Sequence, residues 1–215
     1  MRTVSEIDKH QTKFSCATDL TQPLLEDLSV QLNQGETEPY CRLLDQYISR
    51  PWITFETILD YAALYPKAIL NGPPRATSIR QAPTYERMRE QVQTSGIDVR
   101  EAELGAETFS ECNGWQIAIN ERLGAEEKVM ALLRELCTET TRRLDDQNRR
   151  RDIPEFEASS VRYVVFAVLG LDEDGSPACA LPAQWLAPDS LRASLSRIAT
   201  AAQRVLTVIG PLPTR

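Results

Sequence analysis

Histidine is nearly absent from this sequence of 215 residues, in which His10 is the single example. A zinc site built from two or three imidazoles therefore cannot form within one chain. A Ser-His-Asp triad would have to recruit His10, which stands in a polar N-terminal stretch. The histidine count thus excludes His-rich metal sites and disfavours the common nucleophilic hydrolases.

Paired cysteine motifs are absent as well, since the five cysteines include no C-x-x-C pair. An odd number of cysteines without an export signal is typical of reduced thiols in a cytoplasmic protein. We expect each of the five to be a small buried apolar residue. The first ten residues lack the apolar segment of a secretory signal, and no run of about 18 uncharged apolar residues predicts a membrane span.

Basic residues are outnumbered by acidic ones, because 24 Lys and Arg stand against 31 Asp and Glu and give a net charge of −7. The composition, 42% hydrophobic and 26% charged, is typical of a globular protein. The negative charge argues against strong non-specific binding to nucleic acid, although a local basic patch can persist on an acidic protein.

Apolar residues recur at helical spacing along most of the chain, which predicts an α+β protein that is mostly helical. Trp115, Ile117 and Ile119 alternate with other residues and predict a strand. The segment Val161–Leu171 fits a strand by its β-branched content and a helix by its apolar spacing. The predicted helices cover 23–34, 39–48, a segment capped by Thr54, 83–94, about 125–147, and a last helix capped by Asp189 or Ser190 and stopped by Gly210.

The second half of the chain carries three segments in an informative order. A strand at Asn113–Asn120 leads into a helix containing Leu133–Thr138, and a later helix begins with the run EFEASSVRYVV at Glu155–Val165. This order resembles the minimal zincin domain of the ImmA/IrrE and ArdC-type metallopeptidase families, as does Arg197-Ile198 in the C-terminal helix. The resemblance implies a small-sheet, zincin-like helical domain over residues 97–215.

The first half resembles the N-terminal region of ArdC-type antirestriction proteins. One helix ends in QLNQG at Gln31–Gly35, and Ala68–Thr77 loosely matches the family pattern N-x-x-x-I-x-x-Q-x-P-x-A-T. The resemblance implies a module that binds nucleic acid. We therefore expect a flexible N-terminus at 1–20, an ArdC-like region at 21–96 and a degenerate zincin-like domain at 97–215.

The resemblance places the metal motif of these families, H-E-x-x-H, at Arg134–Thr138. Two imidazoles at i and i+4 lie on one helical face and can hold one metal ion, with the intervening Glu as general base. Here Arg134 and Thr138 replace both imidazoles, and only Glu135 persists. Arginine is permanently cationic and threonine is a poor zinc ligand, so we expect no metal, no other cofactor and no enzymatic activity.

Glu157 matches the acidic third-ligand position of the resemblance. Two interpretations of the charges stay open. Arg134 can pair with Glu157 and occupy the former metal pocket, or the two can be independent exposed charges. Glu135 can be merely a solvated helix residue, because the pattern supplies no acid or base partner for it.

Two arginine clusters are candidates for binding nucleic acid. The first combines basic residues with an aromatic ring, which suits a single strand whose bases stack and whose phosphates pair with cations. The second follows the long helix, where the alternative is a cation-rich helix end followed by a solvated loop. We interpret Trp52 and Trp115 as core or rim packing. The first cluster consists of Arg75, Arg80, Tyr85, Arg87 and Arg89, and the second includes Arg149, Arg150 and Arg151.

Together these features predict a non-catalytic pseudo-metallopeptidase that acts as a nucleic-acid-binding protein, for single-stranded DNA, or as an accessory protein of a mobile element or phage. The alternative is a subunit of a larger complex that binds a protein partner through the former peptidase groove, without nucleic acid. Binding of a labelled single strand across a salt series separates the two hypotheses. The sequence leaves the oligomeric state open.

Overall fold

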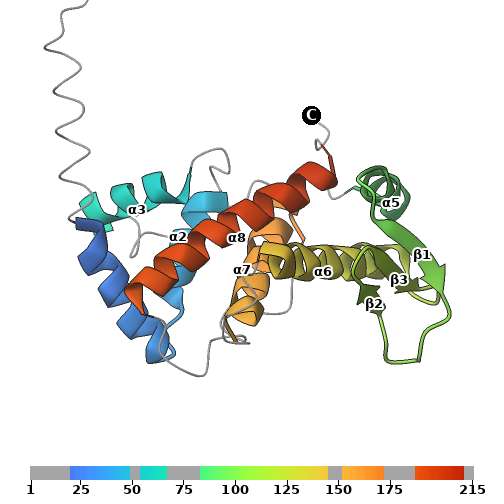
Figure 1. Cartoon of the computed structure of the whole chain (residues 1–215), viewed down its shortest axis with the longest axis horizontal. Helices are drawn as coiled ribbons and strands as arrows, with labels where there is room; N and C mark the ends of the chain where they lie inside the picture. The colour runs from blue at the N-terminus through green and yellow to red at the C-terminus, as the bar shows by residue number, and fades with distance from the viewer. Residues whose placement is uncertain (1–19, 49–53, 67–82, 145–151, 172–186, 211–215) are drawn as a thin grey trace, which may run out of the picture.

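Helices dominate the computed structural model, which describes residues 20–48, 54–66, 83–144, 152–171 and 187–210. A small three-stranded sheet accompanies them (Figure 1). This confirms the expected α+β class with mostly helical content. None of the described helices is long and apolar enough to cross a membrane. After a helix at residues 20–33, the elements in chain order are α2 (Glu38–Ile48), α3 (Phe55–Leu64), α5 (Tyr85–Thr94), β1 (Asp98–Ala102), β2 (Ser110–Asn113), β3 (Gln116–Asn120), α6 (Ala125–Leu144), α7 (Asp152–Leu169) and α8 (Pro188–Val208).

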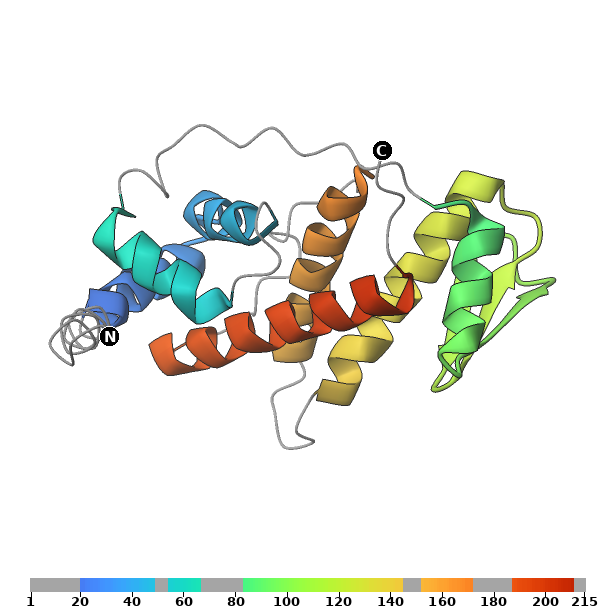
Figure 2. The same cartoon turned by 90° about the horizontal axis from the view of Figure 1, so that it is seen from above.

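The molecule is elongated, with the sheet and the first helices at opposite ends (Figures 1 and 2). Between these ends, α6, α7 and α8 pack against one another. At the sheet end α5 packs on β1 and α6, while at the other end α2 packs on α7 and α3 on α8. The sequence assigns α5 to the region at 21–96, yet its neighbours belong to the region at 97–215.

The sheet has the strand order β1-β3-β2, so β3 is its central strand. β1 runs parallel to β3 with Val99 opposite Ile117, and β2 runs antiparallel to β3 with Cys112 opposite Ile117. Gly114 joins β2 to β3 in the left-handed region, with φ of +64°, where a residue without a side chain meets no steric penalty. Ile117 and Ile119 are completely buried, and β3 packs against α6.

Side-chain caps set the start of two helices where the sequence predicts them. The Thr57 backbone N–H donates to Thr54 Oγ1 at 3.3 Å, at the start of α3. The Arg87 backbone N–H donates to Thr84 Oγ1 at 3.4 Å, at the start of α5. Each cap satisfies an N–H group that has no partner within its helix.

The start of α8 differs from the prediction. The helix begins at Pro188, and its N-cap residue Ala187 makes no side-chain cap. Capping by Asp189 or Ser190 is therefore wrong. Proline suits the first helical position because its φ is already helical and its missing N–H needs no partner there.

The ambiguous segment at Val161–Leu171 is helical as far as Leu169 and belongs to α7. This helix is flanked by α2, α6 and α8, and most of its side chains are buried. A helix that is buried on several sides is apolar all round, and such a pattern is hard to distinguish from the apolar run of a buried strand.

One hydrophobic core extends from the helix at residues 20–33 to Ile209. Two buried tyrosines of α2 connect it by hydrogen bonds. Tyr40 donates to Ser160 Oγ of α7 at 2.8 Å, and Tyr47 donates to the Ala199 carbonyl of α8 at 3.2 Å. Burial raises the pKa of Tyr47 to about 12, so this hydroxyl remains a neutral donor at neutral pH. The first helices and the α7–α8 pair therefore form one packed unit.

Candidate functional site

The three α6 positions that match the metal motif lie in different surroundings. Arg134 is half-buried, whereas Thr138 is exposed. Glu135 accepts a hydrogen bond from Ser110 Oγ of β2 at 2.7 Å. Glu135 is therefore held against the sheet, and its interpretation as a merely solvated residue is wrong.

Glu157 of α7 is completely buried. Its carboxylate accepts hydrogen bonds from Ser194 Oγ at 2.7 Å and from Arg197 Nε at 2.9 and 3.1 Å, and both donors belong to α8. A buried carboxylate is tolerated only where hydrogen bonds and a cation replace its lost hydration. Arg197 supplies such a cation, and the pairing of Glu157 with Arg134 stays a prediction.

These groups do not fit the zinc ion that the resemblance to metallopeptidases implies. A zinc-binding carboxylate directs an oxygen lone pair at the metal, whereas both Glu157 oxygens face the Arg197 guanidinium. Arg134 brings a permanent positive charge to a ligand position of the motif. Within the described ranges, no group of three or more His, Cys, Asp or Glu side chains could hold a metal ion.

The predicted nucleic-acid residues do not form one patch among those that the structure describes. Tyr85 is only 3% exposed and lies with Met88 and Val92 on the buried face of α5, so it cannot stack a base. The helical spacing of these three residues is the sequence signal for that burial. Arg89 donates to the Val99 carbonyl at 3.2 Å, while Arg87 is exposed. Outside the described residues lie Trp52, Arg75, Arg80, Arg149, Arg150 and Arg151.

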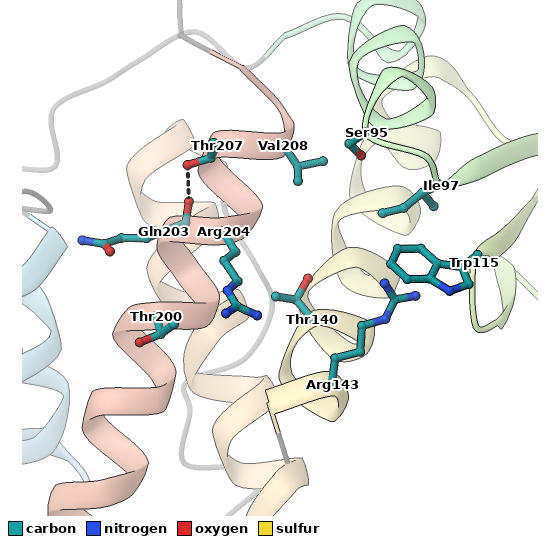
Figure 3. A pocket seen from close by; sticks show the side chains of 10 residues that line it. All are labelled: Ser95, Ile97, Trp115, Thr140, Arg143, Thr200, Gln203, Arg204, Thr207 and Val208. Atoms are coloured by element: carbon teal, nitrogen blue, oxygen red, sulfur yellow. Dashed lines mark hydrogen bonds between the residues drawn. The ribbon is translucent and has the colours of Figure 1, made fainter. Parts of the chain in front are cut away.

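A pocket of about 510 Å³ opens between α6, α8 and the β2–β3 turn (Figure 3). The Arg204 side chain enters it from α8, Arg143 enters it from α6, and the Trp115 indole stands on the side of the sheet. Its lining combines hydroxyl, guanidinium and apolar groups from Ser95, Ile97, Trp115, Thr140, Arg143, Thr200, Gln203, Arg204, Thr207 and Val208. In an acidic chain, these ten described residues include two arginines and no carboxylate.

Trp115 is 58% exposed, which is unusual for so large an apolar side chain. The Arg143 guanidinium carbon lies 3.2 Å from the centroid of the Trp115 ring, in a cation–π arrangement. The same guanidinium donates to Glu139 Oε1 at 2.7 Å and to the Gly114 carbonyl at 3.1 Å. Arg143 therefore holds the indole at the mouth of the pocket and is itself held from two sides.

Of the two expectations for Trp115, core or rim packing, its exposure excludes the core, and its contact with Arg143 places it at the rim of the pocket. The alternation of Trp115, Ile117 and Ile119 places all three on one face of a strand, but β3 begins only at Gln116. Trp115 belongs to the turn after Gly114 and so escapes the alternation. Because Asn113 pairs with Gln116, the loop consists of Gly114 and Trp115, and a glycine at the first loop position is the sequence feature that marks such a turn.

Glu139 anchors the cationic side of the pocket. Its side chain is 9% exposed and pairs with Arg143 at 2.7 Å and with Arg142 at 2.8 Å. Burial raises the pKa of the Glu139 carboxyl, but the hydrogen bonds and charges of Arg142 and Arg143 outweigh burial and lower the pKa below 4.5. Glu139 is therefore ionised at neutral pH and keeps Arg143 in place.

Cys112 of β2 is a half-buried free thiol close to these charges. Burial raises the pKa of Cys112 to about 11, and the carboxylates of Glu139 and Glu135 contribute in the same direction. A thiol that stays protonated at neutral pH is a weak nucleophile. The surroundings of Cys112 therefore do not activate this thiol as a nucleophile.

In comparisons with protein-family models, with curated proteins and with solved structures, nothing matches this chain.

The buried ion pair leads to a first prediction on stability. Replacing Arg197→Met leaves the buried Glu157 carboxylate without this cation, and we expect the free energy of unfolding to fall by about 3–5 kcal/mol. The double variant Arg197→Met with Glu157→Gln should recover part of that loss, because no carboxylate charge is then buried. Urea denaturation followed by circular dichroism measures all three proteins.

The matched control is Arg192→Met on the same helix, whose partner Glu56 lies 3.1 Å away in a more exposed pair. An exposed pair contributes about 0–1 kcal/mol. Equal unfolding midpoints for Arg197→Met and Arg192→Met would show that the Glu157–Arg197 pair stabilises the fold no more than an exposed pair does.

The lowered pKa of Glu139 leads to a second prediction. An ionised Glu139 stabilises the fold above its unfolded-state pKa of about 4.5, and this contribution is lost as the pH falls through the lower folded-state pKa. Glu139→Gln should therefore lower the free energy of unfolding by about 1–3 kcal/mol at about pH 7. The difference between parent and variant should shrink toward about pH 3.

Glu103→Gln serves as its control, since Glu103 pairs with Arg122 where both side chains are more than 60% exposed. This control should stay within about 0.5 kcal/mol of the parent. A Glu139→Gln difference that does not change between the two pH values would contradict the assignment.

Proposed function

We propose that this protein is a non-catalytic binder of single-stranded nucleic acid, and that the strand contacts Trp115 at the pocket between α6 and α8. The observation that carries the proposal is the exposed Trp115 ring with the Arg143 guanidinium 3.2 Å from its centroid. An indole held in this way offers a base a rigid surface for stacking without loss of side-chain freedom on binding.

A single strand suits this surface better than a duplex does. Bases in a duplex are stacked on one another and shield their faces, whereas an unpaired base can stack on an aromatic ring or a guanidinium plane. Arg204 supplies positive charge for the phosphates, in a pocket whose described lining carries no carboxylate, while Arg143 is bound to Glu139 and holds the indole. A local site of this kind is compatible with the net charge of −7.

We further propose that the chain is a degenerate member of the ArdC-type and ImmA/IrrE-like zincin group. The succession of β3, α6 and α7 supports it, because it follows the strand–helix–helix order of the resemblance. Replacement of the imidazole positions by Arg134 and Thr138, together with the hold of Arg197 on Glu157, supports the loss of peptidase activity. An accessory role for a mobile element or phage, in the cytoplasm, belongs to the same proposal.

The test compares the parent with Trp115→Ala in binding a fluorescent oligothymidylate, measured by anisotropy across a salt series. Loss of stacking on one ring costs about 1–3 kcal/mol, so affinity should fall by about 5- to 150-fold. The slope of log K against log salt should stay the same in the variant, at about −0.7 per neutralised phosphate, because the phosphate contacts remain.

Tyr61→Ala is the matched control, since Tyr61 is 45% exposed on α3 at the end of the molecule far from the sheet. It should bind as the parent does. Equal affinity of the parent and Trp115→Ala for the oligothymidylate would show that the strand does not bind at Trp115. Absence of any binding by the parent would reject the proposal and favour the alternative, a protein partner in the former peptidase groove.

A further inference from the structure

The pocket has the size and chemistry for one unit of a polymer chain. We infer that it accommodates a single nucleotide, with the base against Trp115 and the phosphate at Arg204, an inference that rests on the proposed function. The volume of about 510 Å³ lies in the range of about 300–1,000 Å³ that is typical of small-ligand sites. A surface that only followed a sugar–phosphate backbone would need no hollow of this size.

The two arginines of the pocket have different tasks. Arg143 already contacts Glu139, the Gly114 carbonyl and the Trp115 ring, so its charge is largely compensated and its position is set. Arg204 is exposed on the facing helix, and none of the ion pairs within the described part of the chain involves its guanidinium. Arg204 is therefore the cation that is available to an incoming phosphate.

The position of Arg204 follows from the buried pair below it. Arg197 and Arg204 are seven residues apart, which is about two turns, so they lie on nearly the same side of α8. Because Arg197 is bound to Glu157 of α7, this side of α8 is turned toward the neighbouring helices α7 and α6. Figure 3 accordingly shows the Arg204 side chain directed toward Arg143 and Thr140.

Apolar groups at the pocket distinguish a nucleotide from a bare phosphate. Ile97 and Val208 line the pocket together with the Trp115 indole. A base can cover the exposed Trp115 indole and the half-buried Val208 and gain from the burial of apolar area, whereas inorganic phosphate can use only the cation. The chemical class is therefore a nucleoside monophosphate, either free or as one unit of a strand.

The experiment measures binding of thymidine 5′-monophosphate, thymidine and inorganic phosphate at equal ionic strength, by displacement of the labelled oligothymidylate. We expect the monophosphate to bind at least about tenfold more tightly than phosphate or thymidine. In Arg204→Gln, affinity for the monophosphate should fall about tenfold, and affinity for thymidine should not change. The salt slope of the oligothymidylate should fall by about 0.7 in the same variant, which corresponds to one phosphate contact.

Arg192→Gln is the control for charge, because Arg192 belongs to the same helix and faces Glu56. Two results overturn the inference: equal affinities for monophosphate and phosphate, or an Arg204→Gln variant that binds the monophosphate as the parent does. If the oligothymidylate still binds through Trp115 in either case, the proposed function survives this failure. Direct calorimetric binding of the monophosphate without any binding of the oligothymidylate would support the single-nucleotide pocket and reject the proposed function.

Discussion

The contact between Arg197 and the completely buried Glu157 is the constraint on which the rest of the arrangement depends. A carboxylate removed from water requires compensation, and here α8 brings both a guanidinium and the Ser194 hydroxyl to α7. Together with the buried apolar face of α8, the pair orients this helix and so determines where Arg204 lies. Glu157, which stands at a position that resembles a metal ligand, therefore joins α7 to α8 through an ion pair.

A second network of contacts, between Glu139, Arg143 and Trp115, fixes the side chains at the sheet end of the molecule. Glu139 holds Arg143, and Arg143 holds Trp115 through the ring face and the Gly114 carbonyl. Arg134 and Arg143 are nine residues apart on α6, about two and a half turns, and therefore point to opposite sides of the helix. The Arg143 side of the proposed nucleotide pocket and Arg134, which stands at a position that resembles the metal motif, therefore lie on opposite sides of α6.

Features that depend on residues close together in the sequence were predictable, whereas contacts between distant residues were not. The caps at Thr54 and Thr84 depend on residues three positions away, so both helix starts were predictable. The partner of Glu157 lies 40 residues along the chain, so the helix that carries Arg197 was predictable from its own apolar spacing, whereas the pairing was not. The prediction that Trp115 lies in the strand was wrong, because the alternation of apolar residues does not reveal that the turn extends to Trp115 and that β3 begins at Gln116. Contacts that form only when three helices meet leave no local pattern.

The most direct measurement of the central claim is the site of contact itself. Ultraviolet crosslinking of the protein to oligothymidylate, followed by mass spectrometry of the digested complex, identifies the peptides that carry a nucleotide. The account predicts a crosslink on the peptide that contains Trp115, at the end of the molecule occupied by the sheet. Crosslinks confined to other segments, with the Trp115 peptide unmodified, would contradict it.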